Sequence, residues 1–169
     1  MLLEHHIKGC KNGITLGVIL ISLNVFIYLF LPHLLHHGLI YNISFYVIFL
    51  SFPVISMIQT GIVFQSFKVL FSIVFLTLSV SLFLFTVFTL LLYNILDKNL
   101  IFDYLASLED FNKSFGTFNG VSPLSTEEFN SIMSKNYSIK NQLNSYIFSL
   151  IPCILYSSLI SLLIKRIYK

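Results

Sequence analysis

The chain has 169 residues, of which 56% are hydrophobic and only 10% are charged, with a formal net charge of +3 and a mean hydropathy of +0.87. Soluble domains carry about 25% charged residues, so this composition excludes an ordinary soluble domain and indicates a membrane protein. The Lys and Arg residues form no basic stripe with interleaved aromatic side chains, so nucleic acid is not an expected partner.

The first two of four predicted transmembrane helices lie at residues 13–31 and 40–58. A polar lead, residues 1–12, precedes the first apolar stretch. That stretch exceeds the usual core of a cleaved signal peptide and runs to Pro32 without a small-residue cleavage site, so a transmembrane helix is predicted instead. Pro53 predicts a kink in the second span, with neighbouring helices satisfying the freed carbonyls.

Gly9, Gly13 and Gly17 recur every four residues at the start of the first span. Small residues at this spacing let two helix backbones approach closely in a membrane. Packing against another helix of the same chain is favoured here over homodimerisation. Asn24 lies near the middle of the span and is expected to face protein, because an unpaired amide in hydrocarbon is costly.

Two connectors join the first three spans. The first contains three histidines, His33, His36 and His37. An interfacial position is favoured for them over a zinc site, because no Cys or carboxylate accompanies the trio. The second connector, residues 59–68, contains Gly61, which permits a turn, and then Phe64 and Lys68, which are expected to reach the membrane interface.

The third span, residues 69–93, contains no Asp, Glu, Lys, Arg or His. A helix of this length measures about 37 Å and crosses a hydrocarbon core of about 30 Å. Four polar side chains fall seven residues apart along it, at Ser72, Ser79, Thr86 and Tyr93. This row is interpreted as packing against another helix, with hydroxyls bonded to the i−4 carbonyls, in preference to a conducting path.

Residues 94–142 hold most of the remaining charges, with apolar residues at helical spacing, which predicts amphipathic helices. Ser125 and Glu128 have the spacing of a capping box at the start of one of them. The fourth span follows at residues 145–164. The chain is therefore predicted to be one all-α domain, residues 1–169, with four transmembrane helices and a helical segment between the third and fourth.

The basic flanks predict the orientation. With four spans both termini share a side, and six cations lie there, at Lys8, Lys11, Lys68, Lys165, Arg166 and Lys169. Short flanks rich in Lys and Arg stay in the cytoplasm, so both termini are predicted to be cytoplasmic and residues 94–142 extracytoplasmic.

Motifs of enzyme chemistry are missing from the sequence. No span carries an ionisable residue near its middle, and no HExxH, GxSxG or phosphate-binding loop occurs. The carboxylate pairs at 109–110 and 127–128 are adjacent in sequence, so on a helix they point to different faces. Asp97 is expected to cap or pair locally. The sequence predicts no catalytic residue, cofactor or metal site.

Three segments of the chain carry a family resemblance: the Gly-Ile-Thr-Leu-Gly run at 13–17, the run at 61–68, and Tyr-Asn-Ile-Leu-Asp at 93–97. With the four-span layout they resemble the bacterial membrane protein family called domain of unknown function 4199, found mainly in Bacteroidetes-type bacteria. Thr60 and Lys98 stand where the family often has Gly and Pro. The resemblance implies an inner-membrane location without an established activity. It also implies, as one possible partner, a polyprenyl-phosphate glycosyltransferase-like enzyme.

Three functions follow as hypotheses. The first is a non-enzymatic subunit or scaffold that binds another membrane protein or a second copy. The second is a component that handles or transports a lipid or polyprenyl lipid, which predicts a lateral apolar cleft. The third, an enzyme, would require the carboxylates to cluster with a histidine. The candidate packing or interaction residues are Gly13, Gly17, Gly61, Phe64, Lys68, Ser72, Ser79, Thr86, Tyr93 and Asp97.

Overall fold

The computed structural model describes residues 2–30, 39–96, 131, 135 and 138–168. It contains four long α-helices, α1 (Leu2–Phe30), α3 (Leu39–Gln59), α4 (Phe67–Leu91) and α7 (Ile139–Ile167). All four are long and apolar enough to cross a membrane. No strand occurs among the residues described, so the predicted all-α class with four candidate membrane helices is confirmed.

Two shorter elements flank α4. A 3₁₀ turn, η1 (Ile62–Phe64), precedes it, and a π-helical turn, η2 (Leu92–Leu96), continues it. The predicted amphipathic helices, with Ser125 and Glu128, lie outside the described residues, as do Asp97 and the three histidines of the first connector.

Helices α1 and α7 extend beyond the apolar stretches that the sequence marks. Helix α1 begins at Leu2, so the polar lead is helical. Glu4 lies in its first turn, where the positive end of the helix dipole stabilises a carboxylate. Helix α7 begins at Ile139, after Ser138, whose hydroxyl accepts a hydrogen bond from the Asn141 N–H at 3.4 Å. Hydropathy marks where a helix becomes apolar, whereas propensity and capping decide where it begins.

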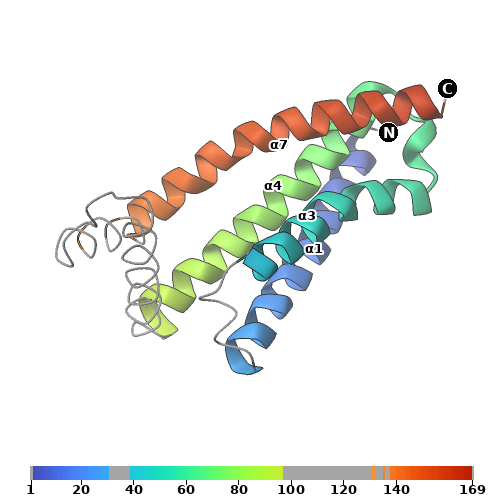
Figure 1. Cartoon of the computed structure of the whole chain (residues 1–169). Helices are drawn as coiled ribbons and strands as arrows, with labels where there is room; N and C mark the ends of the chain where they lie inside the picture. Colours follow the sequence, from blue (N-terminus) through green and yellow to red (C-terminus); the bar gives the residue numbers. More distant parts are fainter. Residues whose placement is uncertain (1, 31–38, 97–130, 132–134, 136–137, 169) are drawn as a thin grey trace, which may run out of the picture.

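The chain runs up and down through the bundle, and both termini lie at one end of it (Figure 1). At that end Asn12 of α1 donates a hydrogen bond to the Ser56 hydroxyl of α3 at 2.8 Å, and Phe64 contacts Tyr168. At the opposite end α4 passes into η2, and α7 starts beside it. This is the arrangement that a four-span chain requires.

Among the four described helices, α1 and α4 approach each other most closely. A Cβ placed on Gly13 would lie 2.7 Å from Val80 Cβ and 2.9 Å from the Thr77 carbonyl oxygen, so the two backbones are almost in contact. Gly9 meets Ile73, and Gly17 meets Leu84, so contacts advance in the same direction along both helices. Helices α1 and α4 are therefore parallel neighbours.

A buried polar contact accompanies this glycine interface. Thr77, with no exposed surface, donates to the Ile73 carbonyl at 2.7 Å and lies 3.3 Å from the Gly9 carbonyl of α1. Asn24, farther along α1, is 3% exposed. The interface therefore holds the polar groups of the span away from lipid, as the cost of desolvating them requires.

Helix α3 packs mainly through its second half. Pro53 has no N–H to donate, and near it the Tyr156 hydroxyl of α7 donates to the Leu50 carbonyl at 2.6 Å. The carbonyl that Pro53 leaves without a helical donor is that of Phe49, four residues earlier, so this bond links the two helices but does not test the predicted satisfaction of the freed carbonyl. The core beneath it consists of buried apolar side chains of all four helices, among them Leu16, Leu20, Met57, Leu70, Ile73, Leu78 and Cys153.

Candidate functional site

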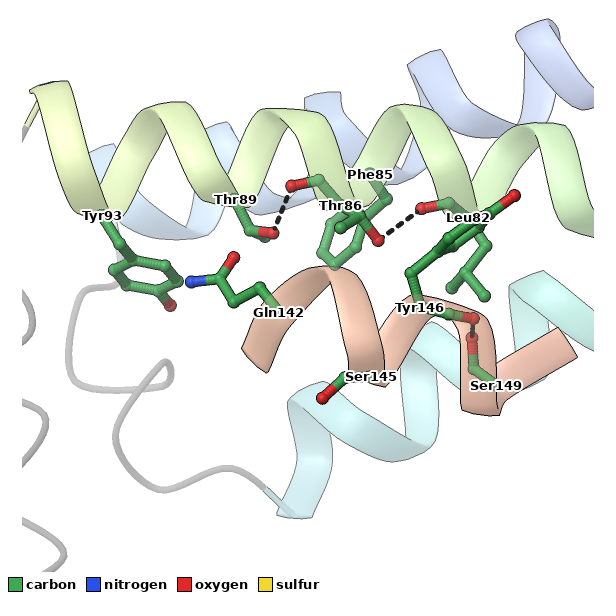
Figure 2. A pocket seen from close by; sticks show the side chains of 9 residues that line it. All are labelled: Leu82, Phe85, Thr86, Thr89, Tyr93, Gln142, Ser145, Tyr146 and Ser149. Carbon is green, nitrogen blue, oxygen red and sulfur yellow. Dashed lines mark hydrogen bonds between the residues drawn. The ribbon is translucent and has the colours of Figure 1, made fainter. Parts of the chain in front are cut away.

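A groove runs between α4 and α7 at the end of the bundle opposite the termini (Figures 1 and 2). It has a volume of about 370 Å³ and opens to the surface of the helix pair. Helix α4 and η2 contribute five residues, and the first turns of α7 contribute four: Leu82, Phe85, Thr86, Thr89, Tyr93, Gln142, Ser145, Tyr146 and Ser149.

Helical spacing explains why these side chains meet. On α4 the adjacent residues Phe85 and Thr86 each lie three or four positions from both Leu82 and Thr89, and Tyr93 continues the same line in η2. On α7 Gln142, Ser145 and Ser149 obey the same rule. Two antiparallel helix faces therefore form the groove.

Most hydroxyl hydrogens in the groove are already used. Thr86 donates to the Leu82 carbonyl at 2.8 Å, Thr89 donates to the Thr86 carbonyl at 2.9 Å, and Ser149 donates to the Tyr146 carbonyl at 2.6 Å. The tyrosine hydroxyl of Tyr146 lies 3.5 Å from the Ser79 carbonyl. Each of these hydroxyl oxygens keeps lone pairs that can accept a hydrogen bond.

Among the residues that the structure describes, no charged side chain lines the groove. Its polar groups are hydroxyls and the amide of Gln142, set among apolar chains and the rings of Phe85 and the two tyrosines. Such a surface suits an uncharged group better than a charged one, because a charged group entering it would lose its hydration without gaining a counter-ion from these nine residues.

The hydroxyl row predicted on the third span divides along the helix. Thr86 and Tyr93 line the groove, and Ser79 lies beside it, its hydroxyl donating to the Phe75 carbonyl four residues earlier. Ser72 is half-buried and lies outside the groove lining. The row is thus not one continuous surface.

The remaining predicted site residues lie elsewhere. Gly13 and Gly17 pack against α4. Gly61 has a left-handed backbone with φ of 66°, which a glycine adopts at little cost, at the start of η1. Phe64 and Lys68 are exposed at the other end of α4, where Lys68 lies in the first turn, 14 positions before Leu82, the first residue of the groove lining.

Two sets of residues were missed from sequence. Thr77 and Ser81, both fully buried, belong to the α4 side of the glycine interface together with Ile73, Leu76, Val80 and Leu84, and their spacing of four matches that of the glycines. On α7 the polar stripe of Gln142, Ser145 and Ser149, with spacings of three and four, could have indicated a polar helix face.

No group of three or more His, Cys, Asp or Glu residues that could hold a metal ion occurs in the described ranges. Cys10 and Cys153 are both free thiols, half-buried and buried respectively. Of the carboxylates only Glu4 falls within the part of the chain that the structure describes, far from the groove.

Four apolar helices with a lateral groove define a multi-pass membrane protein. The chain belongs to the family described as protein of unknown function (DUF4199), whose model matches residues 11–166, so the family resemblance of the sequence is confirmed. No curated protein and no solved structure gives a significant match.

Proposed function

We propose that the protein is a non-enzymatic membrane component that binds a single lipid molecule in the groove between α4 and α7. The groove itself is the observation that carries this proposal. A volume of about 370 Å³ holds part of a lipid, and its apolar walls suit acyl or isoprenoid chains. Of the three hypotheses drawn from sequence, lipid handling is the one that predicts a lateral cleft.

The hydrogen bonds of the lining residues favour one class of lipid. Thr86, Thr89 and Ser149 donate to carbonyls of their own helices and offer mainly acceptor oxygens to a ligand. A phosphate head brings acceptors and negative charge, and the nine described lining residues include no cation to pair with it. An uncharged lipid whose head carries a hydroxyl group, such as a diacylglycerol, fits this pattern.

The expected orientation decides which leaflet the groove would face. We expect an inner membrane with both termini cytoplasmic, because the described helix ends beside the termini carry Lys8, Lys11, Lys68, Lys165 and Arg166. The groove then lies toward the outer leaflet. A reporter that is active only in the cytoplasm, fused after residue 169, tests this orientation.

Site-specific photocrosslinking tests the function. A photoreactive phenylalanine replaces Ser145 in the groove, and the control replaces Ile147, which is 59% exposed on the other face of α7 at nearly the same depth. After irradiation of native membranes, mass spectrometry identifies the adducts. We expect one uncharged lipid class enriched at position 145 and the bulk lipid composition at position 147. Identical lipid profiles at the two positions would contradict the proposal.

The rival hypothesis is a subunit bound to another membrane protein, with the glycosyltransferase-like enzyme or a second copy as the partner. It is supported by α3. Only 17% of its apolar stretch, Asn42–Gln59, is buried within the described structure, so most of this helix surface is left for lipid or protein. A protein adduct at position 145 in the same experiment would favour this hypothesis over lipid binding.

A further inference from the structure

Cations from three helices gather at the end of the bundle that holds the termini. Lys8 and Lys11 lie on α1, Lys68 lies in the first turn of α4, and Lys165 and Arg166 lie in the last turn of α7. Lys11, Lys68, Lys165 and Arg166 are exposed. Glu4 is the one carboxylate within the described ranges.

An exposed apolar ring lies among these cations. Phe64, 75% exposed, follows the buried Ile62 and Val63 in η1 and meets the Tyr168 ring edge-on at 5.9 Å. This contact joins the α3–α4 connector to the end of α7, so Lys68 and the Lys165–Arg166 pair flank the same aromatic corner. The corner thus combines positive charge with an uncovered ring.

We infer that this aromatic corner, formed by Phe64, Tyr168, Lys68, Lys165 and Arg166, binds the headgroup of an anionic phospholipid. Basic residues beside a membrane helix attract anionic lipids, and here Lys68 of α4 and Lys165 and Arg166 of α7 belong to the segments that the Phe64–Tyr168 contact joins. The exposed Phe64 ring distinguishes a lipid from a free phosphate ion, because only a lipid brings an apolar chain that can cover it.

Lipid binding to the purified full chain tests the inference. The protein in mild detergent is titrated with phosphatidylglycerol or with phosphatidylcholine of the same acyl chains, and native mass spectrometry counts the bound lipids. The triple variant K68Q/K165Q/R166Q is compared with K135Q/K140Q, which removes two exposed cations at the opposite end: Lys140 in the first turn of α7, and Lys135, which precedes that helix and accepts a hydrogen bond from the Asn141 side chain at its carbonyl.

The triple variant should lose affinity for phosphatidylglycerol on the order of a hundredfold, with little change for phosphatidylcholine and with near-normal binding in K135Q/K140Q. Phe64→Ala, at an exposed position that leaves the core intact, should weaken phosphatidylglycerol binding several-fold. Equal losses in the triple and control variants would overturn the inference. Displacement of the lipid by inorganic phosphate would assign the corner to a free anion and overturn it too.

Discussion

Adding one methyl group at Gly13 is expected to destabilise the fold by about 2 kcal/mol, which lowers the ratio of folded to unfolded protein roughly 30-fold. The new Cβ would lie 2.7 Å from Val80 Cβ, 2.9 Å from the Thr77 carbonyl oxygen and 3.1 Å from the Leu76 carbonyl oxygen. Two of these three neighbours are backbone atoms, so no side chain can rotate to make room.

The magnitude follows from how far the helices must separate. Carbon atoms pack at about 3.5–4.0 Å, so α1 must move away from α4 by ~0.8 Å. Forcing a methyl group into a packed interface costs about 1–3 kcal/mol. The same movement lengthens the 3.3 Å contact between the Thr77 hydroxyl and the Gly9 carbonyl. An interhelical hydrogen bond of this kind adds roughly 0.6 kcal/mol.

Thiol reactivity provides the assay. Cys153 is 5% exposed, so in a Cys10→Ser background a membrane-permeant maleimide labels it when the bundle opens. Labelling is followed across a denaturant titration of the purified protein. The matched control, Val18→Ile, also adds one methyl group to α1, but on a face that is 55% exposed. Equal midpoints for Gly13→Ala and Val18→Ile would refute the close-packing argument.

Two further predictions use the same assay. Gly61→Ala should lower the free energy of unfolding by about 1–2 kcal/mol, because φ at this position is 66°, although nothing lies within 4 Å of the new Cβ. Gly61→Asn should lower it less, because Asn adopts the left-handed conformation more readily. Equal stability of the original protein and both variants would contradict the left-handed turn. Tyr156→Phe keeps the ring but removes the hydrogen bond to the Leu50 carbonyl, so the free energy of unfolding should fall by roughly 0.6–1.7 kcal/mol. The control variant Tyr168→Phe should leave it unchanged. Equal stability of the two variants would argue against the bond.

The transmembrane helices were predictable because hydrocarbon imposes a length and a composition that few other structures satisfy. The role of the glycines was also suggested by their spacing, but not their partner. A spacing of four indicates that some helix approaches closely, and only the fold identifies that helix as α4 rather than the adjacent α3. Thr77 and Ser81 do not stand out in the sequence, because α4 carries several other Ser and Thr residues and their spacing does not show which helix face meets α1.

The groove was less predictable than the spans. Thr86 and Tyr93 were singled out for their spacing, yet the residues opposite them belong to the start of α7, some fifty residues later in the chain. The order and tilt of the helices decide which polar turn of α7 lies beside which turn of α4. Periodicity within a single helix gives no information on order or tilt. A conducting path along the hydroxyl row of α4 would need polar groups facing one opening over the whole helix. Ser72 lies outside the groove lining, so the groove does not follow the whole row.

The parallel pairing of α1 with α4 has a consequence for biogenesis. Gly9 and the Thr77 hydroxyl that approaches it are 68 residues apart in the chain. At synthesis rates of about 5–20 residues per second, α1 waits in the membrane for roughly 3–14 s before its partner emerges. Throughout that interval the glycine surface is uncovered and can pair with any helix that passes. Insertion of α4 therefore ends a window in which the nascent chain is vulnerable to wrong association.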